Sequence, residues 1–163
     1  MYLSQPSHGV VAVVSVHGDR EFPVDAHGID NVLRLQFDDI ETSDPSDPES
    51  MHRTWTRDKW AKEVGRPMLA PSEEHAKAII EFANSIRRID GLALFQCQGG
   101  ISRSSAAALL CLAVWTGEGH ELYCANEFSR VRPSACPLLG LVALGDRLIQ
   151  RHGCLLSAAK GLR

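Results

Sequence analysis

Cys97 and Arg103 lie six positions apart and are the two side chains of this sequence best suited to chemistry. The residues between them include Gly99 and Gly100, which allow the backbone to curl so that several N–H groups point into one concavity. Such a concavity binds a tetrahedral oxyanion, and an arginine beside it can bind two oxygens of that anion. The spacing therefore predicts an anion-binding loop that begins at a cysteine.

The position of Cys97 favours the thiolate form of its side chain. The residues from Arg103 to Thr116 are rich in alanine and leucine and predict a buried helix, so the loop opens onto a helix N-terminus. The helix dipole, the converging N–H groups and the Arg103 guanidinium each lower the pKa of the thiol below its ordinary value of about 8.5. A thiolate beneath a bound phosphate is a nucleophile aimed at phosphorus. The sequence thus predicts a covalent phosphocysteine intermediate.

The elements that must position this loop follow from hydrophobic patterning. Two short apolar runs and one alternating segment predict strands at Val10–Val16, Leu92–Gln96 and Asn31–Phe37. Helices are expected over four stretches: Ser72 to the residues before Gly91, Arg103–Thr116, His120–Arg130 and Leu138–His152. Strands and helices in this order predict an α/β fold with a central, mainly parallel sheet flanked by helices. Ligands of such sheets collect at the carboxyl ends of the strands, where the loop lies.

Length and composition exclude several classes of protein. The chain has 163 residues, which fits a single domain spanning 1–163, with 41–71 as an irregular flap or insertion and a short helix in part of Thr54–Val64. A hydrophobic content of 44% argues against wholesale disorder, and a net charge of −3 argues against a nucleic-acid partner. No apolar run reaches the roughly 18 residues of a membrane span, so no membrane partner is expected. The oligomeric state is left open.

The five cysteines are widely spaced and form neither a CxxC pair nor a zinc-ligand cluster. An odd number of cysteines is unusual for a disulfide framework, so free thiols are expected. Free thiols, together with the lack of a basic, cleavable start within Met1–Val16, predict a cytoplasmic protein. We expect Cys97 alone to react and the other four to be structural.

Further residues complete a resemblance to a known family. The Cys-x5-Arg loop with its Gly-Ile-Ser-Arg-Ser run resembles the signature of the cysteine-dependent protein tyrosine phosphatases, most closely the dual-specificity branch with its small bacterial members. The segments 37–40 (Phe-Asp-Asp-Ile) and 130–133 (Arg-Val-Arg-Pro) resemble the general-acid segment and the C-terminal part of that family. The resemblance runs from about Val10 to about Gly153 and is weaker outside the loop. It implies a protein tyrosine phosphatase-like fold.

The resemblance also implies a role for each residue of the loop. Cys97 is the nucleophile, Arg103 clamps the phosphate, and Ser104 hydrogen-bonds the cysteine thiolate when it leaves in the second step. The phosphate-binding backbone N–H groups belong to six consecutive residues: Gln98, Gly99, Gly100, Ile101, Ser102 and Arg103. No metal and no cofactor are expected, because the N–H groups and Arg103 stabilise the charge of the transition state.

The general acid has more than one candidate. By the resemblance, Asp39 protonates the departing alcohol and then activates water, with Asp38 as the second choice. Glu41, Asp44 and Asp47 are also close in sequence. The chain departs from the family at Gln96, where a histidine usually precedes the cysteine; glutamine donates hydrogen bonds but carries no charge.

Three functions are compatible with these residues. The first is a phosphomonoester hydrolase acting on the phosphotyrosine of a protein or peptide, with phosphoserine and phosphothreonine left open. The second is a pseudophosphatase that binds phosphorylated ligands without turnover. The third is a phosphatase for phosphoinositides, inositol phosphates or nucleotides, which is less favoured because positions 98–102 contain no lysine.

Overall fold

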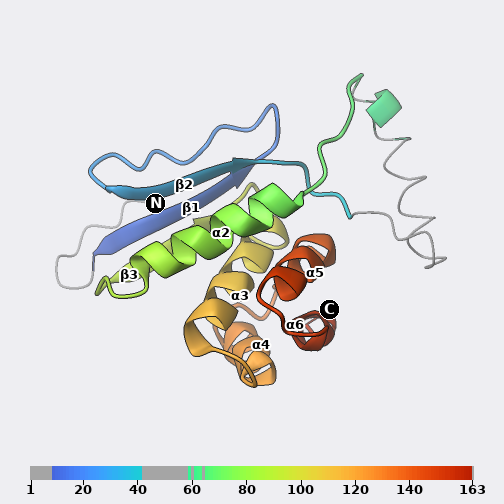
Figure 1. Ribbon diagram of the computed structural model, residues 1–163. Coiled ribbons are helices and arrows are strands. Elements are labelled where there is room, and N and C mark those ends of the chain that lie inside the picture. The colour runs from blue at the N-terminus through green and yellow to red at the C-terminus, as the bar shows by residue number, and fades with distance from the viewer. Residues whose placement is uncertain (1–8, 42–58, 60, 64, 163) are drawn as a thin grey trace.

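A computed structural model describes residues 9–41, 59, 61–63 and 65–162 of the chain. Its sheet contains three parallel strands: β1 (Val10–His17), β2 (Asn31–Gln36) and β3 (Leu92–Gln96). Their order across the sheet is β2-β1-β3, so the most apolar strand is in the middle (Figure 1). The five residues from Ala12 to Val16 are all buried, as expected for a strand that is covered on both faces.

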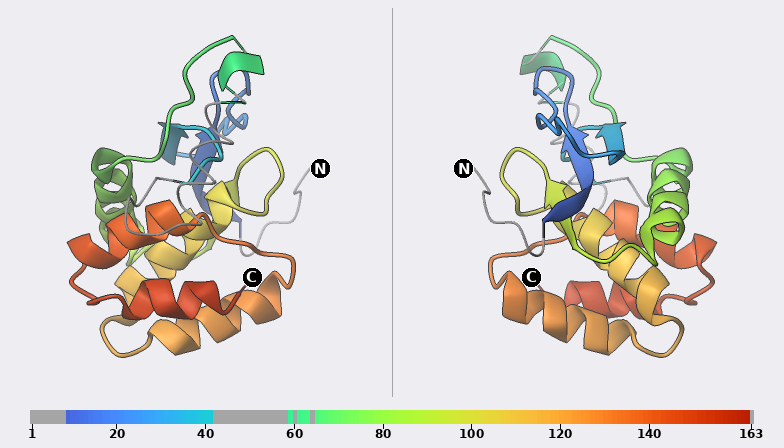
Figure 2. Two further views of the ribbon diagram at one scale, coloured as in Figure 1. Left: turned by 90° about the vertical axis from the view of Figure 1, so that its right-hand side faces the viewer. Right: turned by 90° about the vertical axis from the view of Figure 1, so that its left-hand side faces the viewer.

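Five helices lie in the C-terminal two thirds of the described chain, and four of them correspond to the expected stretches. They are α2 (Glu73–Ile86), α3 (Arg103–Thr116), α4 (Glu121–Val131), α5 (Leu139–Leu148) and α6 (Cys154–Lys160). Helices α2 and α3 contact the strands, and α5 packs on α2 and α3. Helices α4 and α6 lie further from the sheet (Figures 1 and 2). The described part of the chain is therefore an α/β fold with a parallel sheet.

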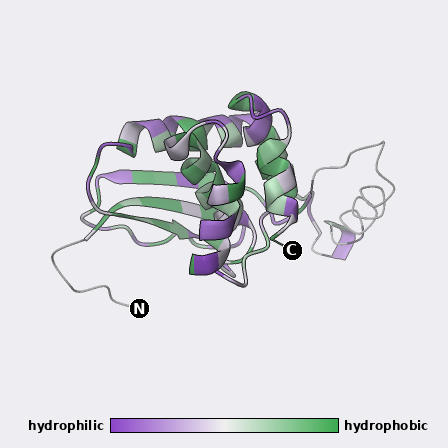
Figure 3. Cartoon of the chain, turned by 90° about the horizontal axis from the view of Figure 1, so that it is seen from below, coloured by the Kyte–Doolittle hydropathy of each residue, from purple (hydrophilic) through white to green (hydrophobic). Residues whose placement is uncertain are grey.

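The core lies between the sheet and these helices. Phe37, Ile79, Leu109, Leu110 and Leu141 are completely buried there, and Figure 3 shows hydrophobic residues running through the strands. The opposite face of the sheet receives the connection 18–30, in which Ala26 is buried and Val24 bonds to β1. The expected flanking by helices thus applies to one face in the described residues, because a connection of the chain covers the other.

The expected helix over Leu138–His152 is present, but it ends four residues earlier than expected. Helix α5 ends at Leu148. Gln150 and His152 have φ of 57° and 53°, values that a right-handed α-helix does not contain. A further helix, α6, begins at Cys154 and was not predicted. The buried Asp146 carboxylate accepts hydrogen bonds from the N–H groups of Gly153, Leu155 and Leu156 at 2.7–3.1 Å and so stabilises the start of α6.

The region 41–71 is described only in part. Lys59 and residues 61–63 are helical, as expected for part of Thr54–Val64; Asp44 and Asp47 lie outside the described residues. Residues 65–71 pass beside the end of β2, where Asp38 and Leu69 exchange backbone and side-chain hydrogen bonds. Within the described residues, no helix is long and apolar enough to span a bilayer.

Candidate active site

The Cys97 loop connects β3 to α3, as the sequence predicts. Gln96 is the last residue of β3 and Arg103 is the first residue of α3. Gly100 has a φ of +64°, a conformation that glycine adopts without strain, and it provides the sharp turn that the loop needs. Cys97 and Arg103 are 5% and 3% exposed, so both chemical groups are held by their surroundings.

The sulfur of Cys97 lies among hydrogen-bond donors. Its Sγ is 3.1 Å from the Ser104 hydroxyl. Burial opposes the thiolate, but hydrogen bonds from the Ser104 hydroxyl and from the backbone N–H groups of Ser104 and Gly100, together with the charge of Arg103, outweigh it and lower the pKa of Cys97. These donors are the N–H groups of the curled loop and of the first helical turn.

Two other buried cysteines lack such donors from a loop. Burial raises the pKa of Cys111 to about 12, and burial also raises the pKa of Cys124 despite a hydrogen bond to Thr116. Free thiols of this kind are inert. The surroundings therefore lower the pKa of Cys97 and raise the pKa of the other two cysteines.

Arg103 is held by a carboxylate that the sequence analysis missed. Its two terminal nitrogens bond both oxygens of Glu21 at 2.9 and 3.0 Å, and one of them also bonds the Phe37 carbonyl at 3.2 Å. Burial opposes the cation, but the Glu21 hydrogen bonds and charge outweigh it and raise the pKa of Arg103. Its Nε is buried and has no hydrogen-bond partner among the described residues, and the Asp39 Oδ2 lies 4.0 Å from it.

Glu21 is itself fixed in place. Its Oε2 accepts the N–H of Gly18 at 2.8 Å. Partial burial opposes ionisation, but hydrogen bonds from Arg103 and Gly18 outweigh it and lower the pKa of Glu21. The sequence contained one usable signal for this residue: Glu21 follows the carboxyl end of β1, the edge of the sheet at which the loop lies.

Asp38 and Asp39 occupy different environments. Asp38 is 6% exposed and binds Arg66 through both oxygens at 2.8 Å, while the N–H of Leu69 donates to it at 2.8 Å. Its hydrogen bond with Arg66 is the main cause of a lowered pKa, although burial acts in the opposite direction. A carboxylate with three donors and little exposure is a poor proton donor.

Asp39 faces the loop instead. Its side chain is 44% exposed, its Oδ1 accepts the Ser102 hydroxyl at 2.6 Å, and its Oδ2 is 4.0 Å from the Arg103 Nε. The carboxylate therefore lies within reach of a group bound between Arg103 and the loop. Glu41, the next candidate, accepts the N–H groups of Leu139 and Gly140 and contributes to the start of α5.

The segment after α4 supports the loop from outside. The N–H of Cys136 donates to the Ile101 carbonyl at 3.0 Å, and the Nε of Arg132 donates to the Gly100 carbonyl at 3.3 Å. These bonds engage loop carbonyls, which leaves the N–H groups for the inner side of the curl. Gln98, Gly99 and Ile101 are exposed, so the loop is accessible.

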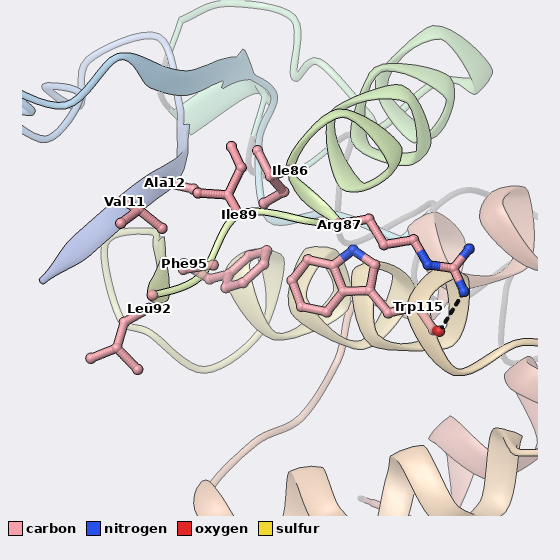
Figure 4. A pocket seen from close by; sticks show the side chains of 10 residues that line it. Val11, Ala12, Ile86, Arg87, Ile89, Leu92, Phe95 and Trp115 are labelled. Atoms are coloured by element: carbon pink, nitrogen blue, oxygen red, sulfur yellow. Dashed lines mark hydrogen bonds between the residues drawn. The ribbon is translucent and has the colours of Figure 1, made fainter. Parts of the chain in front are cut away.

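A cavity of about 300 Å³ lies elsewhere, near the amino ends of β1 and β3. Figure 4 shows its lining of mainly apolar side chains, among them Ile86, Phe95 and Trp115. It contains none of the residues that the sequence singled out for chemistry. In the part of the chain that is described, no three histidine, cysteine or acidic side chains gather as metal ligands would.

No protein-family model, curated protein or solved structure matches this chain. The geometry of the loop and the resemblance of its sequence motif are therefore the features of the chain that bear on function.

Proposed function

We propose that this protein hydrolyses phosphate monoesters through a phosphocysteine intermediate, with phosphotyrosine in a protein or peptide as the substrate class. The observation that carries the proposal is the environment of Cys97. A thiol with a lowered pKa lies in a glycine-containing loop at a helix N-terminus, beside a buried arginine whose Nε makes no hydrogen bond among the described residues. This combination suits nucleophilic attack on a bound oxyanion.

The first step transfers the phosphoryl group to sulfur. The Cys97 thiolate attacks phosphorus, the bond from phosphorus to the ester oxygen breaks, and Asp39 in its acid form gives its proton to the departing alcohol. Arg103 and the N–H groups of residues 98–103 bind the phosphoryl oxygens and stabilise the charge that develops on them. The short path from Asp39 to the loop supports its assignment over Asp38.

The second step returns the enzyme to its starting state. A water molecule attacks the phosphocysteine, Asp39 accepts a proton from that water, and the bond from phosphorus to sulfur breaks. The leaving thiolate receives a hydrogen bond from the Ser104 hydroxyl, which lies 3.1 Å from Sγ. Inorganic phosphate then leaves the loop. The proposed cycle uses no metal. It is consistent with the protein tyrosine phosphatase-like fold and the cytoplasmic location that the sequence predicts.

Hydrolysis of p-nitrophenyl phosphate between pH 5 and 8, in the presence of a chelator, tests the proposal. We expect activity in the native protein and a loss of at least about a thousandfold in Cys97→Ser, because an alcohol is a far weaker nucleophile than a thiolate at these pH values. Cys154→Ser is the matched control and should keep its activity, since Cys154 is an exposed free cysteine at the start of α6. Equal activity in Cys97→Ser and the native protein contradicts the proposal.

A pseudophosphatase is the second candidate. A hydrogen bond of 2.6 Å from the Ser102 hydroxyl to Asp39 favours it, because this bond occupies one carboxylate oxygen of the candidate acid. Such a protein would bind vanadate or phosphate, and Arg103→Ala would abolish that binding, but the native protein would hydrolyse no ester. Binding without turnover therefore distinguishes this function from the first.

A further inference from the structure

Ser15 is a polar residue in the middle of a buried apolar strand. It is 0% exposed, and its neighbours Val14 and Val16 are also buried. A buried hydroxyl destabilises the fold unless it is hydrogen-bonded. Ser15 has two partners: the Val24 N–H donates to its Oγ at 3.1 Å, and its hydroxyl donates to the Gln96 Oε1 at 2.9 Å.

Gln96 extends this chain of hydrogen bonds to the backbone of the nucleophile. It lies opposite Ser15 in the pairing of β1 with β3, and its Nε2 donates to the Cys97 carbonyl at 3.0 Å. The amide has one acceptable orientation, because a flipped amide would place its oxygen against the carbonyl oxygen of Cys97. The bonds thus run in one direction, from the Val24 N–H to the Cys97 carbonyl.

The Cys97 carbonyl is a group that an anion site must keep away from its ligand. A carbonyl oxygen turned into a ring of N–H groups would repel a bound oxyanion. Gln96 binds this carbonyl at the point where β3 ends and the loop begins. The connection 18–30, which supplies Val24, also supplies the Glu21 carboxylate that binds Arg103. One connection therefore reaches both Cys97 and Arg103.

We propose that Ser15 and Gln96 are positioning residues, which form a neutral hydrogen-bond relay that fixes the backbone of Cys97 and aligns its sulfur with the N–H groups of the loop. The inference rests on the proposed phosphatase function. Neither residue touches the substrate; both act through the orientation of Cys97.

The test compares Ser15→Ala with Ser15→Thr, which keeps the hydroxyl. Alkylation of Cys97 by iodoacetamide, followed at the Cys97 peptide by mass spectrometry from pH 4 to 9, reports the thiolate without any need for turnover. In Ser15→Ala we expect the midpoint of alkylation to rise by about one pH unit and kcat for p-nitrophenyl phosphate to fall about tenfold. Ser15→Thr should restore both values. An unchanged midpoint in Ser15→Ala overturns the relay.

Val13→Ala controls for a general loss of stability. Val13 is 1% exposed and lies on the same face of β1, two positions before Ser15, so its truncation removes buried methyl groups and leaves the relay intact. We expect Val13→Ala to unfold at lower urea concentration with an unchanged alkylation midpoint. The same shift in Val13→Ala as in Ser15→Ala would also overturn the relay.

A second variant keeps the test decisive if Ser15→Ala does not fold. Gln96→Met preserves the length of the side chain and removes the donor to Cys97, so its alkylation midpoint should rise in the same direction; no rise counts against the relay. Failure of the proposed function has a different signature. A native protein that hydrolyses no ester refutes the function, whereas the difference in alkylation between the native protein and these variants still decides the relay.

Discussion

Among the carboxylates that follow the carboxyl ends of β1 and β2, three differ clearly in what they bind. Glu21 and Asp38 each bind an arginine through two oxygens, Arg103 and Arg66 respectively. Asp39 has a more exposed side chain, which accepts the Ser102 hydroxyl and lies near Arg103. At the scale of the residue, an arginine engages both oxygens of Glu21 and of Asp38, whereas Asp39, which we propose as the general acid, is held less tightly.

Asp39→Asn removes the proposed acid and should have an effect that depends on the leaving group. Phenyl phosphate has a basic leaving group that needs a proton, whereas the p-nitrophenolate anion leaves readily without one. We expect kcat to fall about a hundredfold for phenyl phosphate and less than about tenfold for p-nitrophenyl phosphate. Steady-state kinetics on the two esters measures the difference. Equal losses would assign the acid to another residue.

Asp38→Asn is the matched variant one position earlier. It leaves Arg66 without its buried carboxylate, so the midpoint of urea unfolding should fall clearly. The ratio of activity on the two esters should stay close to that of the native protein. A leaving-group dependence in Asp38→Asn alone would reverse the assignment of the two residues.

At the scale of the element, one carboxylate decides where a helix begins. The chain leaves α5 through two residues with positive φ, Gln150 and His152, and enters α6 at Cys154. Asp146 is 2% exposed and accepts three N–H groups at this start. These hydrogen bonds satisfy donors that have no partner within the helix. The short helix α6 therefore depends on a residue of the preceding helix.

Asp146→Ala should destabilise the protein by about 2 kcal/mol, because it leaves three N–H groups without their acceptor. Urea unfolding followed by circular dichroism measures this loss. Arg147→Ala, an exposed change on the same helix, should stay within about 0.5 kcal/mol of the native protein. Equal stability of the two variants would show that the Asp146 hydrogen bonds do not hold α6. The alkylation midpoint of Cys97 should not change, since α6 lies away from the loop.

At the scale of the whole molecule, ion pairs tie distant segments to the carboxyl ends of the strands. Glu21 with Arg103 joins the connection 18–30 to α3, and Asp38 with Arg66 joins the end of β2 to residues 65–71. The pKa of each carboxyl is lowered in the folded protein, by hydrogen bonds with its arginine that prevail over burial. Protonation of either carboxyl therefore weakens the fold.

The pH dependence of stability follows from the sign of these shifts. A carboxyl with a lowered pKa in the folded state contributes its full stabilisation above its unfolded pKa of about 4, and loses it as the pH falls through the folded value. We expect the free energy of unfolding to decrease as the pH falls from 5 to 3, measured by urea unfolding. The double variant Glu21→Gln, Asp38→Asn should be less stable at pH 5 and show a shallower decrease. A parallel decrease in both proteins would contradict the assigned ion pairs.

The sequence determined the parts of this protein that depend on neighbouring residues. The three strands, the start of α3 and the placement of Cys97 and Arg103 at one end of the sheet all follow from local patterning, and the structure has them close to the expected positions. A strand, a glycine turn and a helix N-terminus in succession specify where the loop forms, although remote residues such as Arg132 and Cys136 also bond to it. The α/β class could be predicted for the same reason.

The tertiary structure alone decided the partners that are remote in sequence. Glu21 meets Arg103 across 82 positions, Ser15 meets Gln96 across 81, and Ser102 meets Asp39 across 63. Arg66 binds Asp38 and not Asp39, which gives the two neighbouring carboxylates different environments. The contacts of Asp146 stabilise the start of α6 after the end of α5. Local patterns specify which residues form an element, but the packing of the elements fixes which charges and hydroxyls meet, and that pairing sets the pKa and the orientation of each side chain in the site.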